Sequence, residues 1–338
     1  MTGFNTIGLN QAVRSAIAAV GIAALSASPL LAQGADAAKG KKVFLAQGFA
    51  AHPYTATLSK AFKERAEQFG MEVTMQAGGL DAALQSRQID DAIARKVDML
   101  VIMAISEQAV VPSLSRAKEA KIPVVILNNP AREGTQDMYV TFVGQDQKEL
   151  GVAAGRAIAK ALKASGRETA KIALITGALQ GGVGPRRLDG IKTALAGDPK
   201  YEIAATEDGR WDTATSERIA GQLFAKFAAG GGLDAVYGMA DNQALAAVRA
   251  AEAAGVKVGA AAKELVVIGG NCLKEGIDAI KAGKLQASVT QIPTDLGKKA
   301  AEVVNDIFAG KTQPKQVLLP IEIIDKGNVA KWEAACTY

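Results

Sequence analysis

The chemistry open to this chain is limited by its one histidine. His52 is the only imidazole among 338 residues and stands in the stretch QGFAAHPYTAT, residues 47–57. A hydrolytic Ser-His-acid set would have to use it, yet no G-x-S-x-G turn occurs in the sequence. A histidine-containing metal site could use only this one imidazole. The sequence contains no HExxH pattern and no acidic EF-hand loop. We therefore predict no catalytic residue and no metal site.

The two cysteines, Cys272 and Cys336, fit no zinc-binding spacing. Neither has an obvious partner base for nucleophilic catalysis. In an oxidising compartment a single disulfide between them is expected. The alternative is two buried free thiols.

A glycine-rich loop, GALQGGVG at 177–184, invites comparison with a phosphate-binding loop. It lacks the G-K-S/T ending and the G-x-G-x-x-G spacing. We predict a tight turn with close backbone approach there, and no nucleotide or other cofactor. Three acids, Asp146, Asp212 and Asp241, begin or nearly begin helical segments. Helix capping is the first interpretation for each of them, and ligand contact is the second.

Alternating strands and helices must position these residues. Apolar runs typical of strands occur at 43–46, 71–75, 99–103, 123–127, 139–143, 172–175, 265–268 and 317–324. Helical patterns lie between them at 56–69, 82–95, 108–120, 147–164, 212–228, 242–254 and 294–309. Near-continuous apolar runs are typical of strands buried on both faces. The alternation predicts right-handed βαβ crossovers, parallel sheets and an α/β fold.

The loops that follow the predicted strands carry mostly neutral polar side chains: Gln47, Asn128, Asn129, Gln180, Asn242 and Asn271. In open parallel sheets, ligands bind beyond the carboxyl ends of the strands. Amides both donate and accept hydrogen bonds, as hydroxyl-rich ligands require. A binding protein for a polar, largely uncharged small molecule is therefore favoured over an enzyme.

The first 37 residues have the layout of a secretory signal peptide. Arg14 precedes an apolar segment at 16–32, and small residues follow up to Ala37. The segment is too short and too interrupted for a membrane span. The mature chain, about 300 residues long, is expected to be exported and to form two domains. The net charge of +5 comes from basic residues scattered beside acids, so no nucleic-acid partner is expected.

Several stretches carry a family resemblance, in family order: KVFLAQGFAAHPYTATLSKAFKERAEQFG, VGQDQKELGVAAGRAIA, RRLDGIKTAL, DGRWDTATSERIAGQLF and DAVYGMADNQALAAVRAAEAAG. Over about 41–324 the chain resembles the periplasmic solute-binding proteins of ABC transporters, of the ribose-binding type. The resemblance implies two doubly wound parallel-sheet domains joined by a three-stranded hinge, which close over a ligand. It assigns 41–144 and 292–322 to the N-terminal lobe, and 145–291 and 323–338 to the C-terminal lobe.

The resemblance also implies which positions contact the ligand. They are His52, Tyr54, Asn128, Asn129, Arg187, Trp211, Asp241, Asn271 and the hinge residue Gln291. Tyr54 and Trp211 would stack on the ligand. His52 stands where relatives place a hydrogen-bonding asparagine, and binding is expected to change between pH 6 and 8 if its imidazole touches the ligand.

Besides His52, this sequence departs from the sugar-binding pattern at three of these positions. Asn128 and Asn271 are amides where the pattern has carboxylates, and Asn129 replaces an arginine. Because charge-assisted hydrogen bonds are about twice as strong as neutral ones, the expected ligand is a sugar relative: a pentose, polyol, lactone or sugar acid. Arg187 keeps its charge, with fewer carboxylates to neutralise it. A negatively charged ligand is therefore also compatible with these residues. The alternative for Arg187 is a structural ion pair with Asp189 or Asp241.

The implied protein is a periplasmic monomer that delivers a small polyhydroxy ligand to the membrane permease subunits of an ABC transporter. Presentation of the same ligand to a chemoreceptor or sensor kinase is an alternative, and a secreted α/β enzyme is another. The ligand core of a transcriptional regulator shares the fold. It would need a helix-turn-helix where this chain has its export signal.

Overall fold

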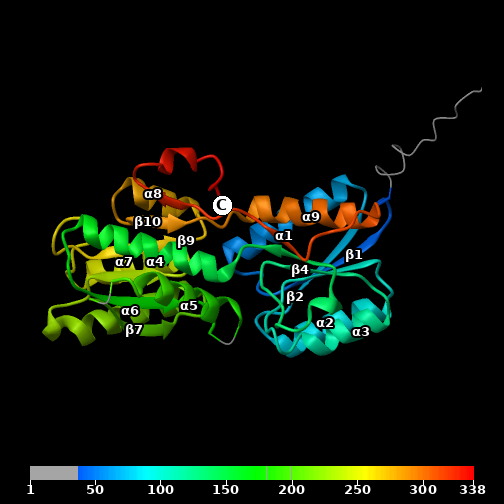
Figure 1. Ribbon diagram of the computed structural model, residues 1–338, viewed down its shortest axis with the longest axis horizontal. Helices are drawn as coiled ribbons and strands as arrows, with labels where there is room; N and C mark the ends of the chain where they lie inside the picture. The colour runs from blue at the N-terminus through cyan, green and yellow to red at the C-terminus, as the bar shows by residue number, and fades with distance from the viewer. Residues whose placement is uncertain (1–36, 180, 199) are drawn as a thin grey trace, which may run out of the picture.

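The computed structural model describes residues 37–179, 181–198 and 200–338. The predicted signal peptide, residues 1–37, lies outside the described residues except for its last position. Two lobes lie side by side along the long axis of the molecule (Figure 1).

The first lobe is built on a six-stranded sheet in the order β11-β5-β4-β3-β1-β2. Its strands are β1 (Lys42–Gln47), β2 (Glu72–Ala77), β3 (Met99–Ile102), β4 (Val124–Leu127), β5 (Thr141–Gly144) and β11 (Gln316–Leu318). All neighbouring strands are parallel. Successive side chains point to opposite faces of a sheet. Val43 and Leu45 accordingly join one apolar cluster, and Phe44 and Ala46 join another.

The second lobe repeats this plan in the order β12-β10-β9-β8-β6-β7. Its strands are β6 (Ala170–Thr176), β7 (Tyr201–Asp208), β8 (Ala235–Gly238), β9 (Val266–Gly270), β10 (Ala287–Val289) and β12 (Ile323–Asp325). Only the pairing of β10 with β12 is antiparallel among the described strands of this sheet.

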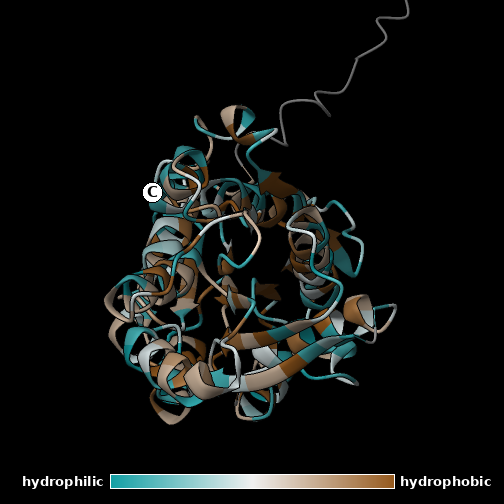
Figure 2. Cartoon of the chain, turned by 90° about the vertical axis from the view of Figure 1, so that its left-hand side faces the viewer, coloured by the Kyte–Doolittle hydropathy of each residue, from teal (hydrophilic) through white to brown (hydrophobic). Residues whose placement is uncertain are grey.

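Helices cover both faces of each sheet, because both faces are apolar. In the first lobe α1 (Pro53–Gln68) and α9 (Pro293–Phe308) cover one face, and α2 (Ala82–Ala94) and α3 (Val111–Glu119) the other. In the second lobe α4 (Gln147–Ala164) and α5 (Val183–Leu195) lie opposite α6 (Thr213–Phe227), α7 (Asp241–Ala253) and α8 (Lys274–Lys281). Short 3-10 turns lie at Gln136–Met138, Ala228–Gly230 and Val329–Lys331. Hydrophobic residues, brown in Figure 2, mark many of the strands.

This arrangement confirms the predicted α/β fold with two parallel sheets. Strands β7, β8 and β10 lie outside the predicted apolar runs, and one predicted run is divided. The apolar run at 317–324 forms two short strands, β11 and β12, which belong to different sheets. Pro320 lies between them and has no amide hydrogen to give to a ladder, so the run cannot continue as one strand. None of the helices in the described part of the chain has the length and apolar character to span a membrane.

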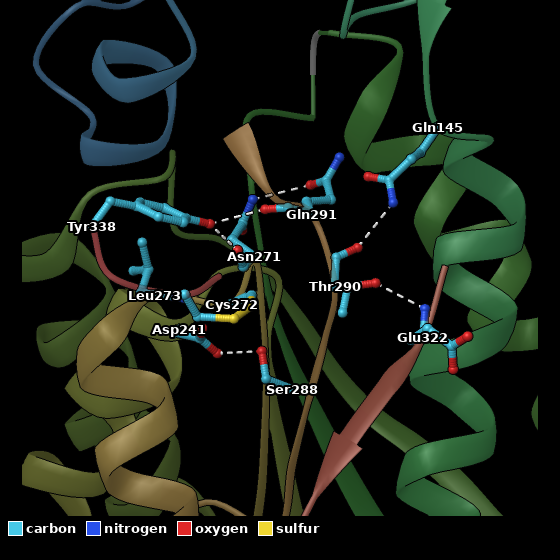
Figure 3. The surroundings of a disulfide bond; sticks show 11 residues. Gln145, Asp241, Asn271, Cys272, Leu273, Ser288, Thr290, Gln291, Glu322 and Tyr338 are labelled. Carbon is cyan, nitrogen blue, oxygen red and sulfur yellow. Dashed lines mark hydrogen bonds between the residues drawn. A yellow bond between two sulfur atoms is a disulfide. The ribbon is translucent and has the colours of Figure 1, made fainter. Parts of the chain in front are cut away.

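The chain passes between the two lobes at three places: after β5, after β10 and between β11 and β12. The amide of Gln145 joins these segments, because its Nε2 donates to the carbonyl oxygens of Thr290 at 3.1 Å and Pro320 at 2.7 Å. The Thr290 hydroxyl accepts from the backbone N–H of Glu322 at 2.8 Å. Figure 3 shows three of these four residues, labelled, beside the second sheet. The exact division of residues between the lobes remains our prediction from the sequence.

Candidate ligand-binding site

A cavity of about 100 Å³ lies between loops at the carboxyl ends of strands from both sheets. This is where ligands bind in doubly wound folds, and it is much larger than the roughly 10–15 Å³ that one water needs. Eight of the nine residues implied by the family resemblance line it: His52, Tyr54, Asn128, Asn129, Arg187, Trp211, Asn271 and Gln291. An apolar part of the wall comes from Phe49, Leu80, Met103, Ile105 and Val183.

His52 caps the first helix and presents a free donor. Its Nδ1 accepts a hydrogen bond from the backbone N–H of Tyr54 at 3.2 Å, so the neutral imidazole carries its proton on Nε2. That Nε2 is buried and has no partner among the described residues. Burial lowers the pKa of His52, and the nearby Asn242 side chain, which makes no hydrogen bond to the ring, partly offsets this. The imidazole stands edge-on to Trp211, with ring centroids 6.5 Å apart.

A chain of hydrogen bonds fixes the first-lobe amides. The Tyr54 hydroxyl donates to Asn128 Oδ1 at 2.9 Å, and Asn128 Nδ2 donates to Asn129 Oδ1 at 2.8 Å. Asn129 Nδ2 in turn donates to the carbonyl oxygen of Ala104 at 2.7 Å. The ring of Tyr54 belongs to the apolar core of the first lobe. Tyr54 therefore reaches the cavity mainly as a support for Asn128.

Arg187 is the cationic group of the second lobe, and it depends on a close helix crossing. A side chain at Gly151 on α4 would overlap the backbone of Arg187, and one at Gly190 would overlap the backbone of Lys148. The two glycines therefore let α4 and α5 approach closely. This brings Arg187 Nε to Gln147 Oε1 at 2.9 Å. The family resemblance did not imply Gln147. Its contact with Arg187 arises from the close crossing of helices α4 and α5.

The guanidinium of Arg187 is buried, with 4% of the residue exposed. Its Nη1 donates to the Met239 carbonyl oxygen at 3.2 Å, and its Nη2 donates to Gln291 Oε1. Its carbon lies 5.6 Å from the ring centroid of Trp211, within cation–π range. Burial lowers the pKa of Arg187.

Asp189 and Asp241, the two carboxylates named as alternative partners of Arg187, form other contacts. Asp189 pairs with Lys148 at 2.8 Å. Asp241 is fully buried, accepting from the backbone N–H of Leu273 and from the Ser288 hydroxyl, both at 2.8 Å. Burial raises the pKa of Asp241 to about 7. The structure thus does not bring Asp241 to the cavity lining, and its contacts connect helix α7 to the loop after β9 and to strand β10.

Asn271 and Gln291 line the cavity on the side of the second lobe. Asn271 Nδ2 donates to Gln291 Oε1 at 3.0 Å, so that this oxygen accepts from both Asn271 and Arg187. Gln291 Nε2 and Asn271 Oδ1 are buried and have no partner among the described residues. Figure 3 shows both side chains beside Tyr338. A ligand can therefore use two donors, Gln291 Nε2 and His52 Nε2, and one acceptor, Asn271 Oδ1.

The structure joins Cys272 to Cys336 in a disulfide, with Cα atoms 5.3 Å apart. The bond holds the segment that leads to Tyr338, whose hydroxyl donates to the backbone carbonyl oxygens of Asn271 and Gln291. Cys272 and Asn271 both have positive φ, at 62° and 85°. Trp211 and Asn128 share this left-handed conformation, each with φ of 61°. Such strained backbone is typical of ligand sites.

Glu107 is a further lining residue that the sequence did not single out. It follows β3 in the first lobe and pairs with Arg186 on α5 of the second lobe, with Oε2 3.2 Å from Nη2. The pair joins the lobes beside the cavity. Among the described residues, no group of three His, Cys, Asp or Glu side chains is placed to hold a metal ion.

Two lobes that meet at a hinge and enclose a cavity at their strand ends have the architecture of a solute-binding protein. Comparison with known families agrees, since residues 43–312 match the family described as periplasmic binding protein domain. The chain belongs to this family, which confirms the resemblance seen in the sequence.

Individual relatives are similar over most of their length. The chain is 24% identical to the ribose import binding protein RbsB of Haemophilus influenzae, covering 88% of this chain and 95% of the relative. Among solved structures, an ABC transporter solute-binding protein from Mycobacterium smegmatis with bound glycerol has a TM-score of 0.77 at 26% identity, covering 86% of this chain and 96% of that one. The arabinose-transporter binding protein of Shewanella sp. ANA-3 has a TM-score of 0.80 at 24% identity, with coverages of 88% and 95%.

Proposed function

We propose that the protein captures a sugar or sugar-like polyhydroxy ligand (a pentose, polyol or sugar acid) between its lobes and delivers it to an ABC permease. It works in the periplasm as a monomer, after removal of the predicted signal peptide, and does no covalent chemistry. The relatives support this class: one is named for ribose import, and another is a solute-binding protein with bound glycerol.

The observation that carries the proposal is a set of three buried polar atoms on residues that line one cavity: His52 Nε2, Asn271 Oδ1 and Gln291 Nε2. None of the three has a hydrogen-bond partner in the described part of the chain. Buried polar atoms are normally hydrogen-bonded. A ligand with several hydroxyl groups can both donate and accept, and so can satisfy all three atoms. Trp211 offers an apolar face for the C–H groups of the same ligand.

A thermal-shift screen of the mature protein tests the ligand class. Pentoses, hexoses, polyols and sugar acids form one panel, and amino acids and short peptides form the control panel. A ligand at 100 times its dissociation constant stabilises a protein by about 2.7 kcal/mol, so a polyhydroxy compound should raise the melting temperature by several degrees. A shift with amino acids or peptides alone would show that the ligand class is wrong.

A further inference from the structure

The charge of Arg187 has no counter-ion in the described part of the protein. Its three hydrogen bonds go to neutral acceptors, namely Gln147 Oε1, the Met239 carbonyl oxygen and Gln291 Oε1. None of the ion pairs among the described residues includes this guanidinium. Buried charges in proteins are normally paired, because an unpaired charge loses its hydration without replacement.

The neighbouring ionisable groups do not neutralise it. Burial raises the pKa of Tyr237 to about 12 and that of Tyr54 further, so both phenols are uncharged at neutral pH. Glu107 is the one carboxylate among the described residues that line the cavity. It is paired with Arg186. The cavity therefore keeps one uncompensated positive charge among its described lining residues, on Arg187.

The hydrogen-bonding groups of the cavity are also unequal in number. A guanidinium has five N–H donors, and three of those of Arg187 are used. The uncharged Tyr237 hydroxyl beside the guanidinium can accept one more, so at least one N–H stays unused. Among the buried lining atoms that have no partner in the described residues, His52 Nε2 and Gln291 Nε2 are donors and Asn271 Oδ1 is an acceptor. A ligand that mainly accepts hydrogen bonds satisfies this set. A carboxylate accepts only, and its two oxygens match the fork of a guanidinium.

The two amides that replace carboxylates in the sugar-binding pattern fit the same ligand. Aspartates at positions 128 and 271 would repel an anion, whereas Asn128 and Asn271 do not. We propose that the cavity takes a sugar acid, an aldonate or uronate, whose carboxylate binds Arg187 and whose hydroxyl groups meet Asn271 and the other amides. This inference rests on the proposed function, because it names one class of polyhydroxy ligand for the same cavity.

Titration calorimetry at pH 7.5 with matched compounds tests it. The probes are D-ribose, ribitol and D-ribonate, then D-galactose, galactitol, D-galactonate and D-galacturonate, so that each acid has neutral counterparts with a similar hydroxyl framework. At least one acid should bind tenfold or more tightly than its counterparts. Arg187→Gln should abolish this difference, and Arg187→Lys, which keeps the charge without the fork, should retain a smaller one. Arg218→Gln is the control, because it removes a charge from an exposed position on α6.

The outcomes separate the two claims. Binding of a neutral sugar or polyol with no acid tighter would overturn the anionic ligand and leave the proposed function standing. Binding of none of the seven, with amino acids shifting the melting temperature instead, would overturn both. The wild-type comparison decides the matter even if Arg187→Gln does not fold, and an acid preference that survives in both folded Arg187 variants would remove Arg187 from the explanation.

Discussion

The hydroxyl oxygen of Tyr338 lies 2.9 Å from the backbone carbonyl oxygen of Gln291 and also contacts that of Asn271. Its ring packs against the apolar core of the first lobe, whereas Asn271 and Gln291 follow strands β9 and β10 of the second sheet. One side chain therefore joins the two lobes next to two residues that line the cavity (Figure 3).

Tyr338→Phe should weaken both the fold and the closed form. The ring stays in place, but two carbonyl groups lose their donor, which typically costs about 1–3 kcal/mol. We expect urea unfolding to show a loss in this range, and calorimetry to show affinity reduced by roughly fivefold, or about 1 kcal/mol. Tyr139→Phe is the matched control, because no described residue is hydrogen-bonded to the Tyr139 hydroxyl. Equal effects of the two substitutions would contradict the role of Tyr338.

The Cys272–Cys336 disulfide should be formed in the exported protein. Thiol titration after denaturation should detect no free thiol. The double substitution Cys272→Ser with Cys336→Ser should reduce stability by about 2–4 kcal/mol, as is typical when a loop of this kind is opened. It should also weaken ligand binding, because Asn271 adjoins Cys272 and the tail carries Tyr338. Two reactive thiols per molecule in the untreated exported protein would exclude the bridge.

Ligand binding should weaken as the pH falls. Burial lowers the pKa of His52 in the closed form, whereas in an open, hydrated cleft it should keep its ordinary value of about 6.5. The closed form therefore binds fewer protons, and closure is favoured above that pH and opposed below it. The change then lies below about pH 6.5, lower than the range of pH 6 to 8 expected from the sequence.

Calorimetry from pH 7.5 to 5.5 with a neutral polyol or sugar that binds measures this effect. Affinity should fall by at most about tenfold per pH unit, because one proton is involved. His52→Asn has no imidazole to titrate and should give a flat profile. Because His52 is the only histidine, parallel profiles for the two proteins would show that it plays no part.

Asp241 should make the protein more stable in mild acid than at neutral pH. Its pKa is raised to about 7 by burial, above the unfolded value of about 3.9. Between these values the folded state binds more protons, so this contribution is present at low pH and is lost as the pH rises through 7. Relative to Asp241→Asn, the wild type should lose unfolding free energy from pH 5 to 8, by at most about 1.4 kcal/mol per pH unit. Urea unfolding at each pH measures this. Unfolding free energies that change with pH in parallel for the two proteins would contradict it.

Much of the fold was predictable because most strands are buried on both faces. Runs such as 99–103 and 123–127 are almost purely apolar, and they form β3 and β4. Strand β7, Tyr201–Asp208, escaped the prediction. It lies at the edge of the second sheet, only Tyr201 and Ala205 of its eight residues are buried, and it carries three acids. An edge strand of this kind has no continuous apolar run to detect.

The candidate site was predictable where a loop position follows directly from the strand before it. Asn128 and Asn271 are of this kind, His52 lies in the loop between β1 and α1, and all three line the cavity. Contacts made by packed helices were not predictable. The bond of Gln147 to Arg187 depends on how closely α4 and α5 cross, and the inward turn of Asp241 depends on Ser288 in a strand 47 positions away.

Residues of both lobes should hold one small ligand in the cavity between them. A crystal structure with the tightest-binding compound of the panel tests it directly. The ligand should lie within hydrogen-bonding distance of Arg187 and Asn271 from the second lobe and of His52 or Asn128 from the first. A ligand bound outside this cavity, or contacted by polar side chains of one lobe alone, would contradict it.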